Sequence, residues 1–228
     1  MSEAKAWCKR LITDKSGLIE TLPDKPLSSD FGLDRGVPVD RFYIEHFLSS
    51  HAALIRGATL EVSENRYTKK FGGDRVSKAL TLHVKNNADV IGNLVTGEGL
   101  SDIHVDCFIM TQTLPFIYES GKALKNAISL LNPGGFLLLT VPGITPISRF
   151  DMANWGQYWS FTDRSLRRLI EEIKDAKIVD LRTYGNVKTS MAFLLGAAQH
   201  ELKPGDFEVF DPAYQLVIGA AVQRVASN

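Results

Sequence analysis

The sequence has few cysteines, no excess of charge and no long apolar run. Cys8 and Cys107 are its only cysteines, and no CxxC pair or Cys/His cluster predicts a metal site. Lysine plus arginine equals aspartate plus glutamate at 26 each, so we expect no nucleic-acid partner. No apolar run could span a membrane, and MSEAKAWCKR lacks a signal-peptide core. We therefore expect a cytoplasmic protein.

The composition is that of an ordinary soluble globular domain. The chain has 228 residues, of which 44% are hydrophobic and 23% charged, enough for a substantial core. Residues 1–38 are rich in Pro, Gly, Ser and charged positions and read as a lead-in, whereas 39–228 form the domain. Residues 40–55, DRFYIEHFLSSHAALI, predict an amphipathic helix with Asp40 as its N-cap.

Short apolar runs then alternate with loops and helical segments. Strands are predicted at ATLEV, ALTLHV, ADVIGNL, VDCFIMTQT, FLLLTVP, AKIVDLRTY and YQLVIGAAVQRV. Helices are predicted at 118–131, at 162–173 with Thr162 or Asp163 as the cap, and at 190–202. Several strands are apolar on both faces, as in a parallel sheet covered on both sides. The fold class is therefore α/β, doubly wound, in a single domain.

The order of these segments resembles the class I S-adenosylmethionine-dependent methyltransferases. The resemblance rests on a strand ending in Glu61, the TQT after the fourth strand, the LNPGG turn before the fifth, and two closing strands. It implies a Rossmann-like, seven-stranded, mostly parallel sheet with an antiparallel last strand. The segments RGVPVDRFYIEHFL, LEVSENRYTKKFGGDRV, MTQTLPFIYE, LNPGGFLLLTVPGITPISRFDMANWGQYWSFT and RTYGNV are similar to a bacterial subgroup found beside glycosyltransferases of surface-polysaccharide synthesis.

The resemblance implies S-adenosylmethionine as cofactor, bound across the carboxyl ends of the strands. Glu61 matches the acidic residue of the first loop, and Ser63 stands where the first glycine is expected. Asn tolerates the left-handed conformation, and a glycine pair downstream is expected to make the close backbone approach. The implied cofactor-binding residues are Glu61, Ser63, Glu64, Asn65, Tyr67, Gly72, Gly73, Asn86, Asn93, Thr111 and Gln112.

Two carboxylates expected at the adenosine end are missing. The usual reader of the ribose hydroxyls is acidic, but Lys85 stands there and has no acceptor, which leaves the carbonyl of Asn86. Asn93 replaces an aspartate that commonly accepts from the adenine amino group. Two readings follow: a methyltransferase with a divergent site, or a non-catalytic methyltransferase-like binding module. A nucleotide-sugar enzyme is a third reading, disfavoured by the lack of a glycine-rich fingerprint.

The segment PGITPISRFDMANWGQYWSFT combines aromatic rings with Asp, Asn and Arg. This mixture suits a carbohydrate or other polyol acceptor, although the tryptophans could equally anchor a long loop to the core. We expect O-methylation of a sugar hydroxyl, with Asp151 as the base and a glycosyltransferase as partner. The expected acceptor-side residues are Arg41, Tyr43, Arg149, Trp155, Tyr158 and Tyr184.

Overall fold

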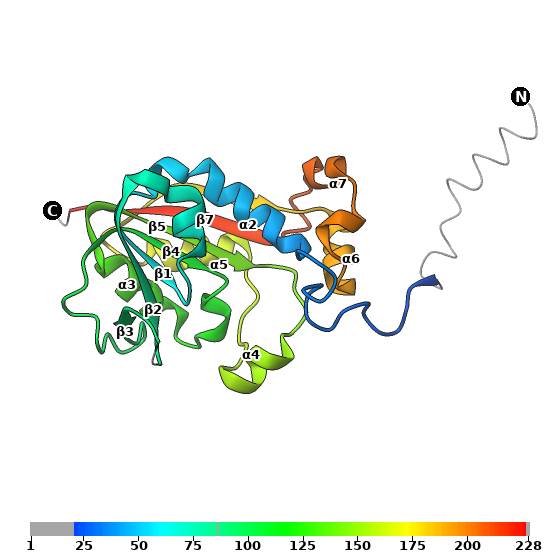
Figure 1. Ribbon diagram of the computed structural model, residues 1–228, viewed down its shortest axis with the longest axis horizontal. Helices are drawn as coiled ribbons and strands as arrows, with labels where there is room; N and C mark the ends of the chain where they lie inside the picture. Colours follow the sequence, from blue (N-terminus) through cyan, green and yellow to red (C-terminus); the bar gives the residue numbers. More distant parts are fainter. Residues whose placement is uncertain (1–20, 86, 227–228) are drawn as a thin grey trace, which may run out of the picture.

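A computed structural model describes residues 21–85 and 87–226 (Figure 1). Seven strands form one sheet in the order β3-β2-β1-β4-β5-β7-β6. Their bounds are β1 Gly57–Val62, β2 Val76–His83, β3 Val90–Ile91, β4 Val105–Thr111, β5 Leu131–Pro142, β6 Ala176–Tyr184 and β7 Val217–Arg224. The first five pair in parallel, and β7 runs antiparallel between β5 and β6. The predicted sheet is confirmed.

Two helical layers cover the sheet. Helices α3 (Ser120–Ser129) and α5 (Asp163–Glu171) pack with one face of the strands around Phe108, Leu137 and Leu139. Helix α2 (Val39–Ser50) crosses the opposite face and shares a second core with α6 (Val187–Leu195) and α7 (Pro204–Glu208) (Figure 1). Apolar side chains on both faces of the central strands are what such a sandwich requires.

The helix ends differ from those predicted. Asp40 is not the N-cap of α2, because Pro38 holds that position without a side-chain cap and Asp40 lies inside the first turn. Helix α2 stops at Ser50 and does not reach residue 55. By contrast, Thr162 does cap α5, accepting a hydrogen bond from the Ser165 N–H at 3.2 Å.

The last predicted helix, 190–202, is misplaced at both ends. Asn186 caps α6 by accepting from the Thr189 N–H, so the helix begins earlier. It ends at Leu195, and its C-cap Gly196 has a φ of 73°, the left-handed conformation that stops many helices. A Cβ at Gly196 would lie 2.3 Å from the Ser28 carbonyl oxygen. This close approach brings the lead-in against the end of α6.

Residues 27–38 pack against the end of α6 and the turn that follows it. The Leu27 N–H donates to the Leu195 carbonyl at 2.7 Å, and Pro38 bridges Ala198. The lead-in thus reaches the start of α2 at the carboxyl edge of the sheet. Among the described residues, no helix is both long and apolar enough to cross a membrane.

Candidate functional site

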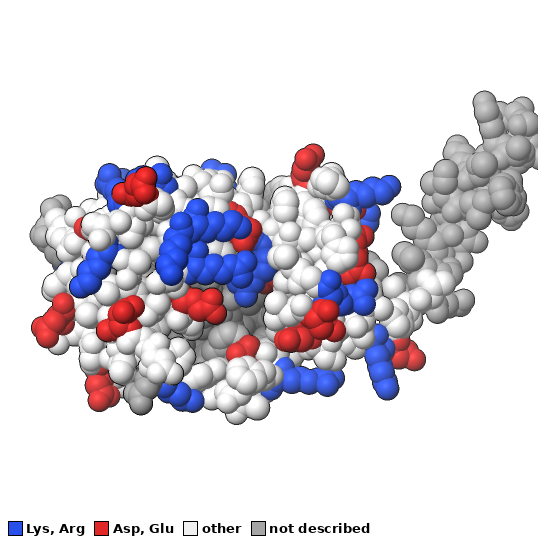
Figure 2. All heavy atoms as spheres, in the orientation of Figure 1, with Lys and Arg blue, Asp and Glu red and all other residues white. Residues whose placement is uncertain are grey.

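A cavity of about 680 Å³ opens at the carboxyl ends of β1, β2 and β4. Strands β1 and β4 are neighbours, but the connection after β1 packs on the α2 face and the helix after β4 packs on the other. Ligands of doubly wound sheets bind at such switch points. Figure 2 shows the hollow in the middle of the face, with basic side chains gathered along its upper rim. Arg41 and Arg66 are among its lining residues.

Strained backbone gathers at this cavity. Four non-glycine residues of the described chain have a left-handed φ, and three of them, Phe31, Ser63 and Gln112, line the cavity. Ser63 follows β1 and Gln112 follows β4, with φ of 67° and 50°. Such conformations cost free energy, and they cluster at functional sites where the surrounding structure holds them. The switch point is therefore the best-supported site in the fold.

Glu61 organises the loop after β1. Its carboxylate is 4% exposed and accepts hydrogen bonds from the Tyr67 N–H at 3.1 Å and from the Thr68 N–H and hydroxyl, both at 2.7 Å. Burial raises the pKa of Glu61, and these hydrogen bonds offset part of the rise. Both carboxylate oxygens of Glu61, though it lines the cavity, are thus used to hold the turn.

The remaining loop residues divide between the cavity and the surface. Ser63 lines the cavity while its N–H donates to the Leu82 carbonyl at 2.9 Å, which ties the loop to the end of β2. Glu64 and Tyr67 also line it, whereas Asn65 does not.

The glycine pair lies elsewhere. Gly72 and Gly73 lie in the turn before Val76, the first residue of β2, and neither lines the cavity. Since the cavity is at the opposite end of that strand, near Leu82, the separation is about 20 Å along β2. The expected close approach of these glycines to a ligand is not what the fold provides, and they serve the turn into β2.

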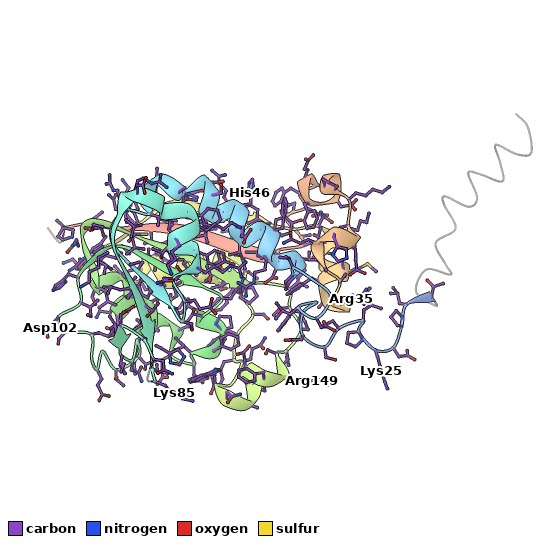
Figure 3. The ribbon with its side chains drawn as sticks, in the orientation of Figure 1. Lys25, Arg35, His46, Lys85, Asp102 and Arg149 are labelled. Carbon is purple, nitrogen blue, oxygen red and sulfur yellow. The ribbon has the colours of Figure 1, made fainter. Side chains whose placement is uncertain are left out.

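The lysine at the end of β2 contacts the loop after β5. Lys85 Nζ lies 4.1 Å from the centroid of the Trp155 ring, a cation–π contact, and the His83 ring meets the same indole edge-on at 5.7 Å. Trp155 follows α4 (Arg149–Asn154), and Figure 3 labels Lys85 and Arg149, the first residue of that helix, along the same lower edge of the molecule. Asn86 lies outside the described residues.

Asn93 lines the cavity but has already committed its oxygen. Oδ1 accepts from the Val95 N–H at 2.8 Å and from the Thr96 N–H at 3.3 Å. Two N–H donors on one atom identify it as the oxygen. Because both lone pairs are used, the expected contact from Oδ1 to an adenine amino group is not offered by this geometry. The amide nitrogen of Asn93 is the group left to meet a ligand.

The end of β4 presents an unused donor. Thr111 and Gln112 both line the cavity. Within the described parts of the chain, Gln112 Nε2 is buried without a hydrogen-bond partner. An unpaired buried amide costs about 1–3 kcal/mol, so this position favours a ligand that accepts a hydrogen bond.

The first turn of α2 contributes more residues to the cavity than the sequence predicted. Arg41 was expected at the site, and its Nη1 donates to the Tyr67 hydroxyl at 2.9 Å. Asp40, expected only as a cap, also lines the cavity, and its buried Oδ1 has no partner among residues 21–85 and 87–226. Burial raises the pKa of Asp40, against a smaller lowering by Arg41. The sequence signal that could have identified this site is the pair of adjacent, oppositely charged residues at the start of a predicted helix.

The loop after β5 closes the cavity from the other side. Asp151, Trp155, Gln157 and Tyr158 line it, and the Tyr158 N–H donates to the Pro115 carbonyl at 2.8 Å. Three exposed rings form an aromatic cluster at the mouth, with centroids 5.5–5.7 Å apart, and consist of Tyr118, Tyr158 and Trp159.

Three residues expected on the acceptor side do not line the cavity. The Tyr43 hydroxyl is buried and donates to Thr189 Oγ1 at 3.2 Å. Tyr184 stacks on Tyr43 at 5.8 Å, and burial raises its pKa to about 12. Arg149 is exposed at the start of α4. Both tyrosines belong to the core beneath α2, which explains their aromatic character without a ligand.

The described residues contain no group of three or more His, Cys, Asp or Glu side chains placed to hold a metal ion. Cys107 is fully buried, and burial raises the pKa of its thiol.

Comparison of the sequence with known proteins finds only a short similarity. No family model matches the chain. The protein named "Probable polyketide synthase 10" of Dictyostelium discoideum is 28% identical over 71 residues, which are 31% of this chain but only 3% of that protein.

Similar solved structures cover most of the chain. The N-methyltransferase NodS from Bradyrhizobium japonicum WM9, in complex with S-adenosyl-L-homocysteine, is 13% identical at a TM-score of 0.52 and covers 92% of this chain and 97% of its own. The plantazolicin methyltransferase BpumL, in complex with the same ligand, is 10% identical at a TM-score of 0.51, covering 85% and 87%. The chain therefore has the class I methyltransferase fold.

Proposed function

We propose that the protein is an S-adenosylmethionine-dependent methyltransferase. The observation that carries this proposal is the cavity at the switch point, where left-handed Ser63 and Gln112 end two adjacent parallel strands. Bent backbone at these two ends serves the same purpose as a glycine-rich loop, because it lets a ligand lie across the strands. The two methyltransferases described above were solved with S-adenosylhomocysteine, the demethylated form of that cofactor.

The lining residues fit such a cofactor. Leu82, Leu94 and Val95 offer apolar walls for adenine, and the Asn93 amide nitrogen can donate to a ring nitrogen. Glu64 lies in the loop that Ser63 ties to the end of β2, so its carboxylate can take the place of the one missing at Lys85 for the ribose hydroxyls. Gln112 Nε2 supplies a donor that has no partner within the described residues.

We assign the acceptor to the side formed by the loop after β5. When bound, the cofactor supplies an electrophilic methyl group, and an acceptor hydroxyl must lose its proton as it is methylated. Asp151 lines the cavity from α4, and we assign it the role of accepting that proton. The aromatic cluster at the mouth offers ring faces for a sugar or other small-molecule acceptor. We propose O-methylation of a glycan hydroxyl, with a glycosyltransferase as partner, a choice supported by the sequence resemblance.

Calorimetry with S-adenosylmethionine and S-adenosylhomocysteine tests the cofactor. We expect saturable binding of both and a rise in the melting temperature. No heat and no thermal shift at millimolar ligand would refute the proposal. Transfer of a radiolabelled methyl group to a panel of methyl glycosides then tests the acceptor class.

A second function is favoured by one observation. Lys85 stands at the sequence position where the resemblance places the diol-binding acid and is held against Trp155, which is the arrangement expected of a binding module that has lost the cofactor. In that case the parent protein would bind no cofactor, and placing Asp at both Lys85 and Asn93 would create binding. A tightly bound cofactor in the purified parent would rule this alternative out.

A further inference from the structure

We propose that Asp40 and Arg41, in the first turn of α2, recognise the amino-acid end of the cofactor, with the carboxylate of Asp40 receiving the ammonium and the guanidinium of Arg41 receiving the carboxylate. This inference rests on the proposed function. In methyltransferases of this fold, the loop after the first strand is expected to recognise the amino-acid end of the cofactor. Here that role is assigned to a helix.

The loop after β1 has already used several of its polar groups. Both oxygens of Glu61 hold Tyr67 and Thr68. The Ser63 N–H donates to Leu82 and the Glu64 N–H to the Val62 carbonyl, each at 2.9 Å. Neither of the first two N–H groups after β1 is therefore free for a ligand carboxylate.

Asp40 has what an ammonium group needs. It lines the cavity, and its Oδ1 is buried without a partner in the described chain. A buried carboxylate oxygen left unpaired is costly, and an ammonium hydrogen would satisfy it with a charge-assisted bond. The burial that raises the pKa of Asp40 is the same environment that would strengthen such a bond.

Arg41 has what a carboxylate needs. One of its nitrogens donates to the Tyr67 hydroxyl, which fixes the guanidinium between α2 and the loop after β1. A guanidinium has five N–H donors in a rigid fork, so donors remain for a bidentate contact. The contact lies at the N-terminus of a twelve-residue helix, where the helix dipole also favours an anion.

The adjacent acid and base therefore match a zwitterion. Only one end of S-adenosylhomocysteine is zwitterionic, and the opposite wall near Trp155 and Leu94 suits its adenine. The apposition of Asp40 and Arg41 orients the ligand along the cavity, with adenine towards β2 and β3 and the amino acid towards α2.

Two analogues separate the roles of the two residues. One, S-adenosyl-4-thiobutyrate, keeps the carboxylate and lacks the amino group. The other, 5′-(3-aminopropylthio)-5′-deoxyadenosine, keeps the amino group and lacks the carboxylate. Calorimetry on wild-type protein should show each analogue binding at least about thirtyfold more weakly than S-adenosylhomocysteine.

Each variant should then abolish one of the two affinity differences between S-adenosylhomocysteine and the analogues. In Asp40→Asn the gap between S-adenosylhomocysteine and the deaminated analogue should shrink to below about threefold, while the carboxylate gap stays. Arg41→Gln should do the reverse, with Arg41→Lys intermediate because it keeps the charge without the fork. Glu45→Gln makes the same charge change on the same helix outside the cavity and should keep both gaps. Thermal unfolding verifies that each variant folds.

The outcomes are distinct. Wild-type protein that binds all three compounds equally, or variants that weaken all three equally, would overturn the inference while leaving the proposed cofactor standing. Asp40→Asn that keeps both gaps but loses methyl transfer would assign Asp40 to the acceptor and also overturn it. Wild-type protein that binds none of the three would refute the proposed function together with the inference.

Discussion

Replacing Glu61 by Gln tests whether this buried carboxylate holds the loop after β1. The carboxylate receives three hydrogen bonds, from the Tyr67 N–H and from the Thr68 N–H and hydroxyl. The single amide oxygen of Gln can keep about one of these and turns an NH₂ group towards the remaining donors. Two lost bonds at roughly 1 kcal/mol each give a loss of about 2 kcal/mol in the free energy of unfolding. For a domain of this size the melting temperature should fall by about 4–8 °C.

The pH dependence adds an independent check. Burial raises the pKa of Glu61 above its ordinary 4.5, so the folded state holds the proton more tightly than the unfolded state. The stability that protonated Glu61 contributes is complete below pH 4.5 and is lost as the pH rises through the raised pKa. The difference in the free energy of unfolding between wild-type and Glu61→Gln should therefore be largest at low pH and decrease as the pH rises.

The assay is urea denaturation followed by circular dichroism over a pH series. Glu64→Gln is the matched control, because Glu64 is exposed in the same loop and its side chain holds no part of the turn. If Glu61→Gln has the same free energy of unfolding as Glu64→Gln, the assigned role of Glu61 is wrong.

Three further predictions concern the cavity and the core. Trp155→Ala removes the cation–π contact with Lys85 and should raise the dissociation constant of S-adenosylhomocysteine about two- to fivefold by calorimetry; an unchanged value would show that the contact does not steady the cavity wall. Asp151→Asn should lower methyl transfer to a glycoside acceptor by about 10²–10⁴-fold, with S-adenosylhomocysteine affinity kept; equal activity would exclude it as the base. In a Cys8→Ser background, Cys107 should react with a thiol reagent only in denaturant, because it is buried and its pKa is raised; reaction in the native protein would contradict this.

The sheet could be predicted from the sequence because its strands carry short apolar runs that only a covered parallel sheet accommodates. The order of the motifs then supplied the antiparallel last strand. Helix ends were harder, since the start of α2 depends on Pro38 and the stop of α6 on a close approach between Gly196 and Ser28. Residues distant in sequence decide such contacts, and no local pattern reveals them.

The site was predicted unevenly for a similar reason. Residues directly after a strand, such as Ser63 and Gln112, do line the cavity, because parallel strands end at one edge of the sheet. Asp40 was read as a cap, since nothing local shows that its oxygen would be buried without a partner. Gly72 and Gly73 were assigned to the cavity because glycines allow a close backbone approach, although their place before β2 puts them at the other edge.

The contact between Lys85 and Trp155 makes two distant positions interdependent. A carboxylate introduced at 85 would add the acceptor that a ribose diol prefers, but it would also withdraw the cation from the indole and set a negative charge near the negative face of the ring. The two effects on ligand affinity oppose each other. The affinity of a single variant at position 85 therefore gives their sum and not the contribution of the carboxylate alone. Only a variant that also replaces Trp155 with an uncharged, non-aromatic residue separates them. To replace the lysine at the end of β2 by a ribose-binding carboxylate, natural or engineered substitutions must therefore change the end of β2 and the loop after β5 together.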